Sequence, residues 1–109
     1  MDSILVSIKK LLGIVEEDEY FDPDIIMCIN SAFSALTQLG VGPQEGFSIQ
    51  DKSAVWSDFI DEPKLENVKV YIFLKVRQTF DPPTSSAVLD AISRQISELE
   101  WRINATVDY

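Results

Sequence analysis

The stretch LENVKVYIFLKVRQTF, residues 65–80, decides the fold, because two periodicities compete in it. Val68, Val70 and Ile72 alternate with charged or aromatic residues, which is typical of a strand. Sixteen residues are more than an ordinary strand contains, however, and an apolar surface almost all round the axis is typical of a central helix in a bundle. The length therefore predicts a helix over residues 64–79 and, with it, an all-α fold.

The sequence after this stretch predicts a stop and then a longer helix. Two prolines follow Phe80 and Asp81, and proline cannot continue the hydrogen-bond ladder of a helix. Over residues 85–104 the apolar residues step by three and four, as in a heptad repeat, and form the seam Leu89, Ile92, Ile96, Leu99 and Ile103. Alternating charges at i, i+4 spacing predict an exposed flank made of Asp90, Arg94, Glu98 and Arg102.

The sequence before this stretch predicts two further helices. Apolar residues recur at helical spacing over residues 3–12, while Lys9 and Lys10 fall away from the apolar stripe. A second apolar face runs over residues 23–39, and Asp22 followed by Pro23 is typical of an N-cap and a first helical residue.

The segment between the second helix and the central one has weaker patterns. Apolar residues alternate with polar ones over a short run, so a minimal strand is expected near residues 47–49. Apolar residues at i, i+3 and i+4 from Trp56 predict a helical turn over residues 53–60. The expected architecture is a single helical domain, residues 1–109, built as a small bundle of four main helices with this short turn.

The composition excludes several classes of function. Of the 109 residues, 46% are hydrophobic and 25% charged, as in a globular domain. Nine Lys and Arg stand against eighteen Asp and Glu, and this net charge of -9 argues against binding the phosphate backbone of nucleic acids or an anionic membrane. The chain contains no histidine, so imidazole bases and the usual zinc sites are excluded. We therefore expect no enzymatic activity, no catalytic residue and no cofactor.

Cysteine usage and hydropathy bear on the compartment. Cys28 is the only cysteine, so no internal disulfide can form, and a reducing interior such as the cytoplasm is expected. Within the second helix and without basic neighbours in sequence, this thiol is expected to pack rather than to act as a nucleophile. No apolar run approaches the roughly 20 residues that a membrane helix needs, and no signal peptide is expected.

An acidic segment between the first two helices is one candidate interaction surface. Several carboxylates together can chelate a divalent cation, but the spacing of a calcium-binding loop is absent, so no metal site is expected. A solvated loop is the ordinary interpretation of a charge run, and a surface that attracts a basic partner or repels nucleic acid is the functional alternative. The segment contains Glu16, Glu17, Asp18, Glu19, Asp22 and Asp24.

Trp101 belongs to the second candidate surface. It lies about 120° around the helix from the seam of residues 89–103, at roughly 100° per residue, so it belongs either to a wide core face or to a separate contact surface. Packing in the core is the favoured interpretation. If the side chain is exposed, a tryptophan beside Arg102 is typical of an interface anchor.

Several phrases of the chain resemble one protein family. KKLLGI, FDPDIIMCINSAFSALTQLGV, VKVYIFLKVRQTFDPP and the closing ISELEWRIN are together similar to the head–tail connector, or head-completion adaptor, proteins of tailed bacteriophages. The resemblance implies a virion protein, a small helical bundle that assembles with copies of itself into a ring of about twelve subunits beneath the portal protein. Such a ring would prolong the channel, so that DNA passes without being specifically bound, and stopper or tail proteins would dock on it.

The resemblance also implies roles for two regions near the C-terminus. By position, it makes Phe80, Asp81, Pro82 and Pro83 a structural corner. It makes the helix that carries the seam of residues 89–103, together with the tail after it, a contact element.

The excess negative charge lies in one part of the chain. Residues 1–62 contain twelve acids and three bases, whereas residues 63–109 contain six of each. We expect the acidic part to face the channel or an end of the ring, since a channel that passes DNA should not hold it. The main rival is an acidic helical protein that inhibits a DNA-binding protein by mimicking DNA, although six of the twelve acids are bunched in one segment. A metal-assisted enzyme built on carboxylates is the third alternative.

Overall fold

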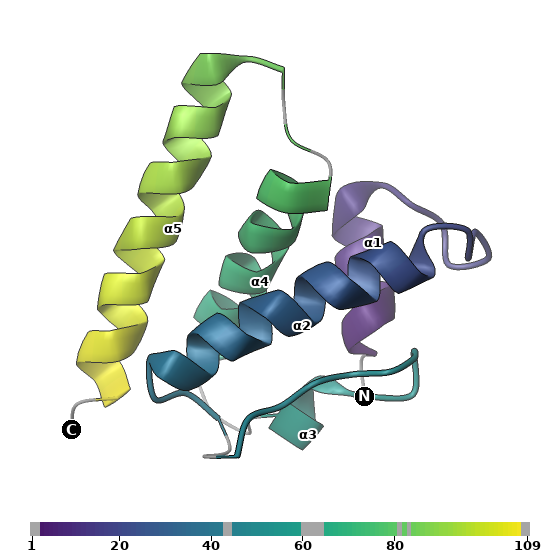
Figure 1. The fold of residues 1–109 in the computed structure, drawn as a ribbon, viewed down its shortest axis with the longest axis horizontal. Helices are drawn as coiled ribbons and strands as arrows, with labels where there is room; N and C mark the ends of the chain where they lie inside the picture. Colours follow the sequence, from purple (N-terminus) through teal and green to yellow (C-terminus); the bar gives the residue numbers. More distant parts are fainter. Residues whose placement is uncertain (1–2, 43–44, 60–64, 81, 83, 108–109) are drawn as a thin grey trace.

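A computed structural model describes residues 3–42, 45–59, 65–80, 82 and 84–107 of the chain. Figure 1 shows the helices in these residues, which confirm the predicted all-α fold of four main helices and a short turn. The short turn covers fewer residues than the expected 53–60. The helices are α1 (Ile4–Leu12), α2 (Asp22–Gln38), α3 (Trp56–Phe59), α4 (Leu65–Phe80) and α5 (Ser86–Val107).

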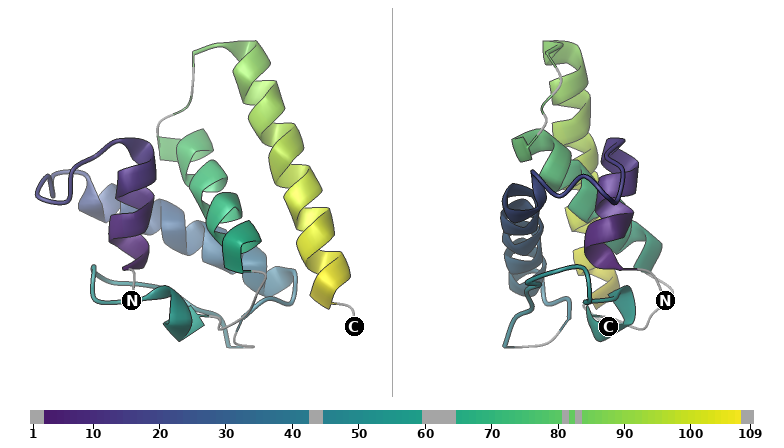
Figure 2. Two further views of the ribbon diagram at one scale, coloured as in Figure 1. Left: turned by 180° about the vertical axis from the view of Figure 1, so that it is seen from behind. Right: turned by 90° about the vertical axis from the view of Figure 1, so that its right-hand side faces the viewer.

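Three of the helices form one layer with α4 in the middle. Both α1 and α5 pack against α4, and α2 crosses one face of the layer against α1 and α4 (Figures 1 and 2). The molecule is accordingly flat, with extents of 40 × 36 × 21 Å. The outer sides of α1 and α5 are the two edges of this layer, which the same figures show at opposite ends of the molecule.

The central position of α4 explains its ambiguous sequence. Helices contact it on three sides, so apolar residues are needed almost all round its axis. Val68, Tyr71, Ile72 and Val76 are completely buried, whereas Val70 is 45% exposed. The helix predicted from the length of this stretch is therefore confirmed. The strand-like alternation arose because three helices, α1, α2 and α5, pack against different sides of α4.

The remainder of the core comes from α1, α2 and the chain that follows α2. On α2, the buried side chains follow the helical repeat, and each of the large ones contributes about 1.5–3 kcal/mol through removal from water. Phe33 of α2 contacts Phe47 and Phe59, with ring centroids 4.9 and 4.7 Å apart. This aromatic cluster joins the loop after α2, and the α3 turn within it, to α2 itself.

The minimal strand expected near residues 47–49 is wrong, because the backbone there pairs with a side chain. The Asn30 side chain of α2 accepts a hydrogen bond from the Ile49 amide at 2.7 Å and donates one to the Ile49 carbonyl at 3.0 Å. A single carboxamide thus satisfies the groups that a neighbouring strand would have bonded. In the described residues, the one isolated β-bridge joins Ser3 and Val55.

The start of α2 also differs from the expected cap by one residue. Phe21 occupies the cap position without a side-chain hydrogen bond, and Asp22 is the first helical residue. Phe21 packs edge-on against Phe80, with ring centroids 5.5 Å apart, and so joins the start of α2 to the end of α4. The Asp22 carboxylate does not cap the helix, because it pairs with a buried lysine.

Candidate functional site

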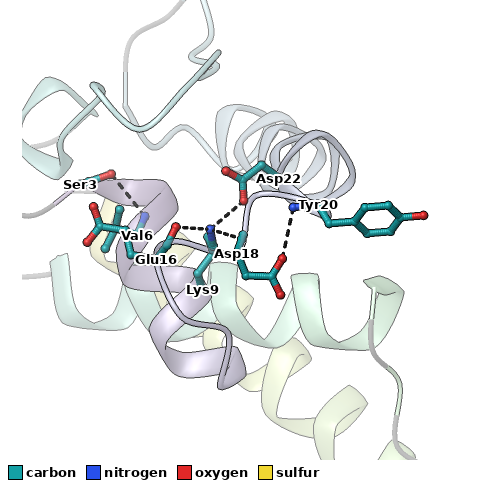
Figure 3. Close-up of polar contacts among 7 residues, drawn as sticks. All are labelled: Ser3, Val6, Lys9, Glu16, Asp18, Tyr20 and Asp22. Atoms are coloured by element: carbon teal, nitrogen blue, oxygen red, sulfur yellow. Dashed lines mark hydrogen bonds and ion pairs between the residues drawn. The ribbon is translucent and has the colours of Figure 1, made fainter.

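Lys9 organises the chain between α1 and α2, although its place in the sequence suggested an exposed residue. Only 2% of it is exposed, and it is the one charged residue that is buried in the described part of the chain. Its Nζ donates to the carbonyl oxygens of Glu16 at 3.0 Å and Asp18 at 2.7 Å, and pairs with Asp22 Oδ1 at 2.8 Å (Figure 3). Two hydrogen bonds to carbonyl oxygens and one ion pair thus surround the ammonium group, which makes its burial tolerable.

The loop that Lys9 holds presents its side chains to solvent. We call residues 15–21 the acidic loop. Its carboxylates, those of Glu16, Glu17, Asp18 and Glu19, are exposed, whereas Asp22, just beyond it, is partly buried against Lys9. Val15 is 64% and Tyr20 81% exposed, and Figure 3 shows the Tyr20 ring pointing away from the helices. The acidic loop therefore combines negative charge with exposed apolar surface in a fixed shape.

A hollow of about 510 Å³ lies between the outer side of α1 and the acidic loop. The apolar side chains of Val6, Ile14 and Val15 line it, and Gly13 adds backbone where α1 ends. Charged residues stand on its rim, namely Lys10, Glu16 and Glu17. We call this feature the α1 hollow. No sequence pattern predicts it, because it is formed where the loop folds back beside the helix.

Trp101 lies on the opposite edge of the molecule and is 72% exposed, so the favoured interpretation of core packing is wrong. The buried stripe of α5 consists of Ile92, Ile96 and Ile103. Trp101 comes five residues after Ile96, which is about 140° around the helix, so its indole points away from α4. The alternative interpretation, a separate contact surface, agrees with this position.

The charged row beside Trp101 is exposed as predicted. Asp90, Arg94, Glu98 and Arg102 all face solvent, and Arg102 forms an ion pair with Glu98. We call Arg94, Glu98, Trp101 and Arg102 the α5 edge. The structure therefore does not bring the candidate residues into one site. It places the acidic segment at one end of the helical layer and the α5 edge at the other.

The arrangement offers little for chemical catalysis. Among the described residues, no group of three or more Cys, Asp or Glu side chains is placed to hold a metal ion. Burial, followed by the charge of Asp24, raises the pKa of the Cys28 thiol, which disfavours the reactive thiolate. No helix in the described ranges is long and apolar enough to span a membrane.

The proposed corner lies where the chain reverses between α4 and α5. α4 ends at Phe80, whose ring contacts Phe21, and Pro82 is exposed. Asp81 and Pro83 lie outside the described residues, and the structural role given to the corner stays a prediction.

A buried hydrogen bond fixes α5 against α4 near the α5 edge. The Tyr71 hydroxyl donates to Glu100 Oε2 at 2.7 Å, and the Tyr71 side chain is completely buried. Burial, and then the Glu100 carboxylate, raise the pKa of Tyr71 well above its ordinary value of 10.0. Above that value the unfolded chain loses a proton that the folded protein keeps, so stability falls as the pH rises.

We expect Tyr71→Phe to lower the free energy of unfolding at pH 7 by about 1–2 kcal/mol, because one hydrogen bond to a carboxylate is lost. Above about pH 10 the variant should lose stability less steeply than the parent, because the shifted phenol is gone. Urea denaturation from pH 7 to 11 measures both effects. A Cys28→Ser background removes the other group whose pKa is raised. Equal slopes in the two proteins would contradict the prediction.

Comparison with known proteins connects this geometry to one family. The family of phage connector proteins matches residues 4–109, which include the acidic loop, the α1 hollow and the α5 edge. Neither curated proteins nor solved structures gave a match.

Proposed function

The chain belongs to the phage connector protein family, and from this premise we propose that it is a ring-forming adaptor that joins the portal to the tail or stopper during virion assembly. Family membership makes it a structural phage protein and a virion component that contacts other head and tail proteins. The proposal adds the ring, the position below the portal and assembly in the cytoplasm of the host.

The open edges of the helical layer support the proposal of a ring. A subunit that uses two different surfaces for the same contact forms a closed ring when the rotation between copies closes. Here the outer sides of α1 and α5 face in opposite directions, and each carries exposed apolar surface. Trp101 is the single observation that favours assembly most, since an exposed tryptophan is a common anchor of protein interfaces.

The distribution of charge supports passage of DNA without binding. Of the acidic side chains described between residues 3 and 59, most lie in the acidic loop and the first turn of α2. Surfaces of this kind repel phosphate and leave a DNA strand free to slide past. They also offer carboxylates to a basic surface on the portal or the stopper. The acidic segment, residues 16–24, therefore remains a proposed interaction surface.

Native mass spectrometry of the purified full-length chain, alone and with its portal protein, tests this function. The expected species is a ring of about twelve copies, formed alone at high concentration or on the portal. A chain that stays monomeric under both conditions would contradict the proposal. Inhibition of a nuclease or a repressor by the same preparation would instead support the DNA-mimic alternative.

A further inference from the structure

The two edges of the helical layer differ in shape. The α5 edge carries the exposed indole of Trp101, on a helix that packs against α4, and beside it lies a smaller hollow of about 170 Å³. The α1 hollow is concave, with an apolar lining and a charged rim. A projecting aromatic side chain on one edge and a hollow on the other are complementary features of a single chain, and the helices that carry them, α5 and α1, lie at opposite ends of the layer.

The charges at the two edges are complementary as well. The α5 edge carries Arg94 and Arg102 against Glu98, one net positive charge close to Trp101, although Asp90, one turn before Arg94, makes the whole exposed row neutral. The rim of the α1 hollow has two glutamates and Lys10, which leaves it with one net negative charge. Arg94 lies two helical turns before Trp101 and therefore on the same side of α5. A contact that buries the indole would thus also bring opposite charges together.

We propose that Trp101 of one copy inserts into the α1 hollow of the next copy, so that the layer of α1, α4 and α5 continues from subunit to subunit around the ring. The inference rests on the proposed ring and names the surfaces that form it. The occupant of the hollow is a second copy of this chain. In this contact, Val6, Ile14 and Val15 cover the indole, while Arg94 and Arg102 approach Glu16 and Glu17.

Electrostatics favour this head-to-tail contact over a symmetric one. Two copies that met hollow to hollow would bring four glutamates together with two lysines, and such unbalanced charge opposes association. Two copies that met through their α5 edges would offer each tryptophan a hollow of about 170 Å³ beside Glu98 and Arg102, against about 510 Å³ in the α1 hollow. A head-to-tail contact avoids both arrangements and repeats around a closed ring.

The Lys9 contacts prepare the hollow for this partner. The ammonium group fixes the backbone at Glu16 and Asp18, and Glu16 is one of the residues that line the hollow. A loop that already has its bound shape loses less conformational entropy on association. This provides a reason for burying a lysine beneath a surface loop.

The inference changes one expectation about the acidic segment. Glu16 and Glu17 lie at the contact between copies in this arrangement, so they do not face the channel or an end of the ring. Asp18, Glu19 and Asp24 remain available for those positions. Burial of Glu16 and Glu17 on assembly therefore distinguishes the two placements.

Cysteine cross-linking of the full-length chain in a Cys28→Ser background tests the contact. Glu17→Cys places a thiol on the rim of the hollow, and Ser97→Cys places one on exposed α5, one turn before Trp101. A short bismaleimide should join the two variants only when they are mixed, and the double variant should give a ladder that ends at the ring size. Glu45→Cys, an exposed position on the loop after α2, is the matched control and should not join to Ser97→Cys.

Substitution of the anchor provides a second measurement. Trp101→Ala should raise the concentration needed for assembly by about 30-fold or more, the loss expected for a central aromatic anchor, while the melting temperature stays the same. Met27→Ala removes another side chain that is 70% exposed, on α2, and should change neither quantity. Assembly should also shift the emission of Trp101 to shorter wavelengths. Trp56 is already buried and should contribute little to that shift.

The outcomes separate this inference from the proposed function. Rings that form, alone or on the portal, without cross-links between Glu17→Cys and Ser97→Cys overturn the inference and leave the function standing. Cross-links between copies of the same variant overturn it as well, since they show a symmetric contact. The absence of rings under every condition overturns both.

Discussion

Lys9→Met should lower the free energy of unfolding by about 3 kcal/mol, one of the two largest effects expected in this chain. Methionine keeps the apolar stem but removes the ammonium group, so the carbonyls of Glu16 and Asp18 and the carboxylate of Asp22 lose their partner. Each hydrogen bond to a charged group contributes about 1.5–3 kcal/mol, and water can replace part of it because the partner side chain of Asp22 is 20% exposed. Urea denaturation measures the loss, and the melting temperature should fall by roughly 10 °C.

Two controls assign the effect to the buried ammonium group. Lys10→Met removes the same charge from an exposed neighbour and should change stability by less than about 0.5 kcal/mol. Asp22→Asn, alone and combined with Lys9→Met, forms a double-mutant cycle. The combined loss should be smaller than the sum of the single losses, because both substitutions break the same ion pair. Strict additivity, or equal losses for both lysines, would contradict the explanation.

The importance of Lys9 could not be predicted from the sequence, since two of its three partners are backbone carbonyls. Amphipathic periodicity places Lys9 beside the apolar stripe of α1, where a lysine is ordinarily solvated. Only the return of the chain after α1 brings the carbonyls of Glu16 and Asp18 to the ammonium group. The types of side chain in a sequence predict burial and helix formation, but they do not predict where the backbone carbonyl groups of a loop lie.

The helical fold was predictable because its determinants are local. The length of the stretch 65–80, the prolines after it and the heptad-like seam of α5 together define α4 and α5. Asn30 shows the limit of this approach. A polar residue in the middle of a helix was the one available signal, and its partner, Ile49, is nineteen residues away. The strand expected around Ile49 failed because a side chain supplied hydrogen bonds that alternation alone attributes to a sheet.

Of the two candidate surfaces, the exposure of the acidic segment was predictable from local sequence, whereas the exposure of Trp101 depends on the tertiary fold. The charge of the acidic segment follows from composition, and its exposure follows from the cost of burying carboxylates. Trp101 could be core or interface, since a helix can present a wide apolar face. The position of α5 at the edge of the layer decides between them, because no element covers the side away from α4 in the described structure. The α1 hollow could not be predicted at all, because it depends on how the loop after α1 lies beside that helix.

The second large effect concerns Gly42, whose substitution should break the packing of the loop after α2. Gly42 has a positive φ of 84°, and a Cβ added there would lie 2.4 Å from Phe59 Cε1 and 2.9 Å from Cζ. The Phe59 ring cannot move easily, because it packs against Phe33 and Phe47. A left-handed backbone costs an alanine about 1–2 kcal/mol, and overpacking costs about 1–3 kcal/mol more. Gly42→Ala should therefore lose about 2–5 kcal/mol in urea denaturation.

Gly13→Ala separates the two causes, because it shares the backbone conformation without the contact. Its φ is 82°, and a Cβ there would meet nothing within 4 Å, so only the cost of the left-handed backbone, about 1–2 kcal/mol, is expected. The difference between the two variants then measures the collision with the Phe59 ring. Phe59→Leu should reduce this difference, since a smaller side chain leaves room for the added methyl group. Equal losses at Gly42 and Gly13 would mean that the aromatic cluster yields to the methyl group, and that the loop after α2 is held chiefly by the hydrogen bonds from Asn30.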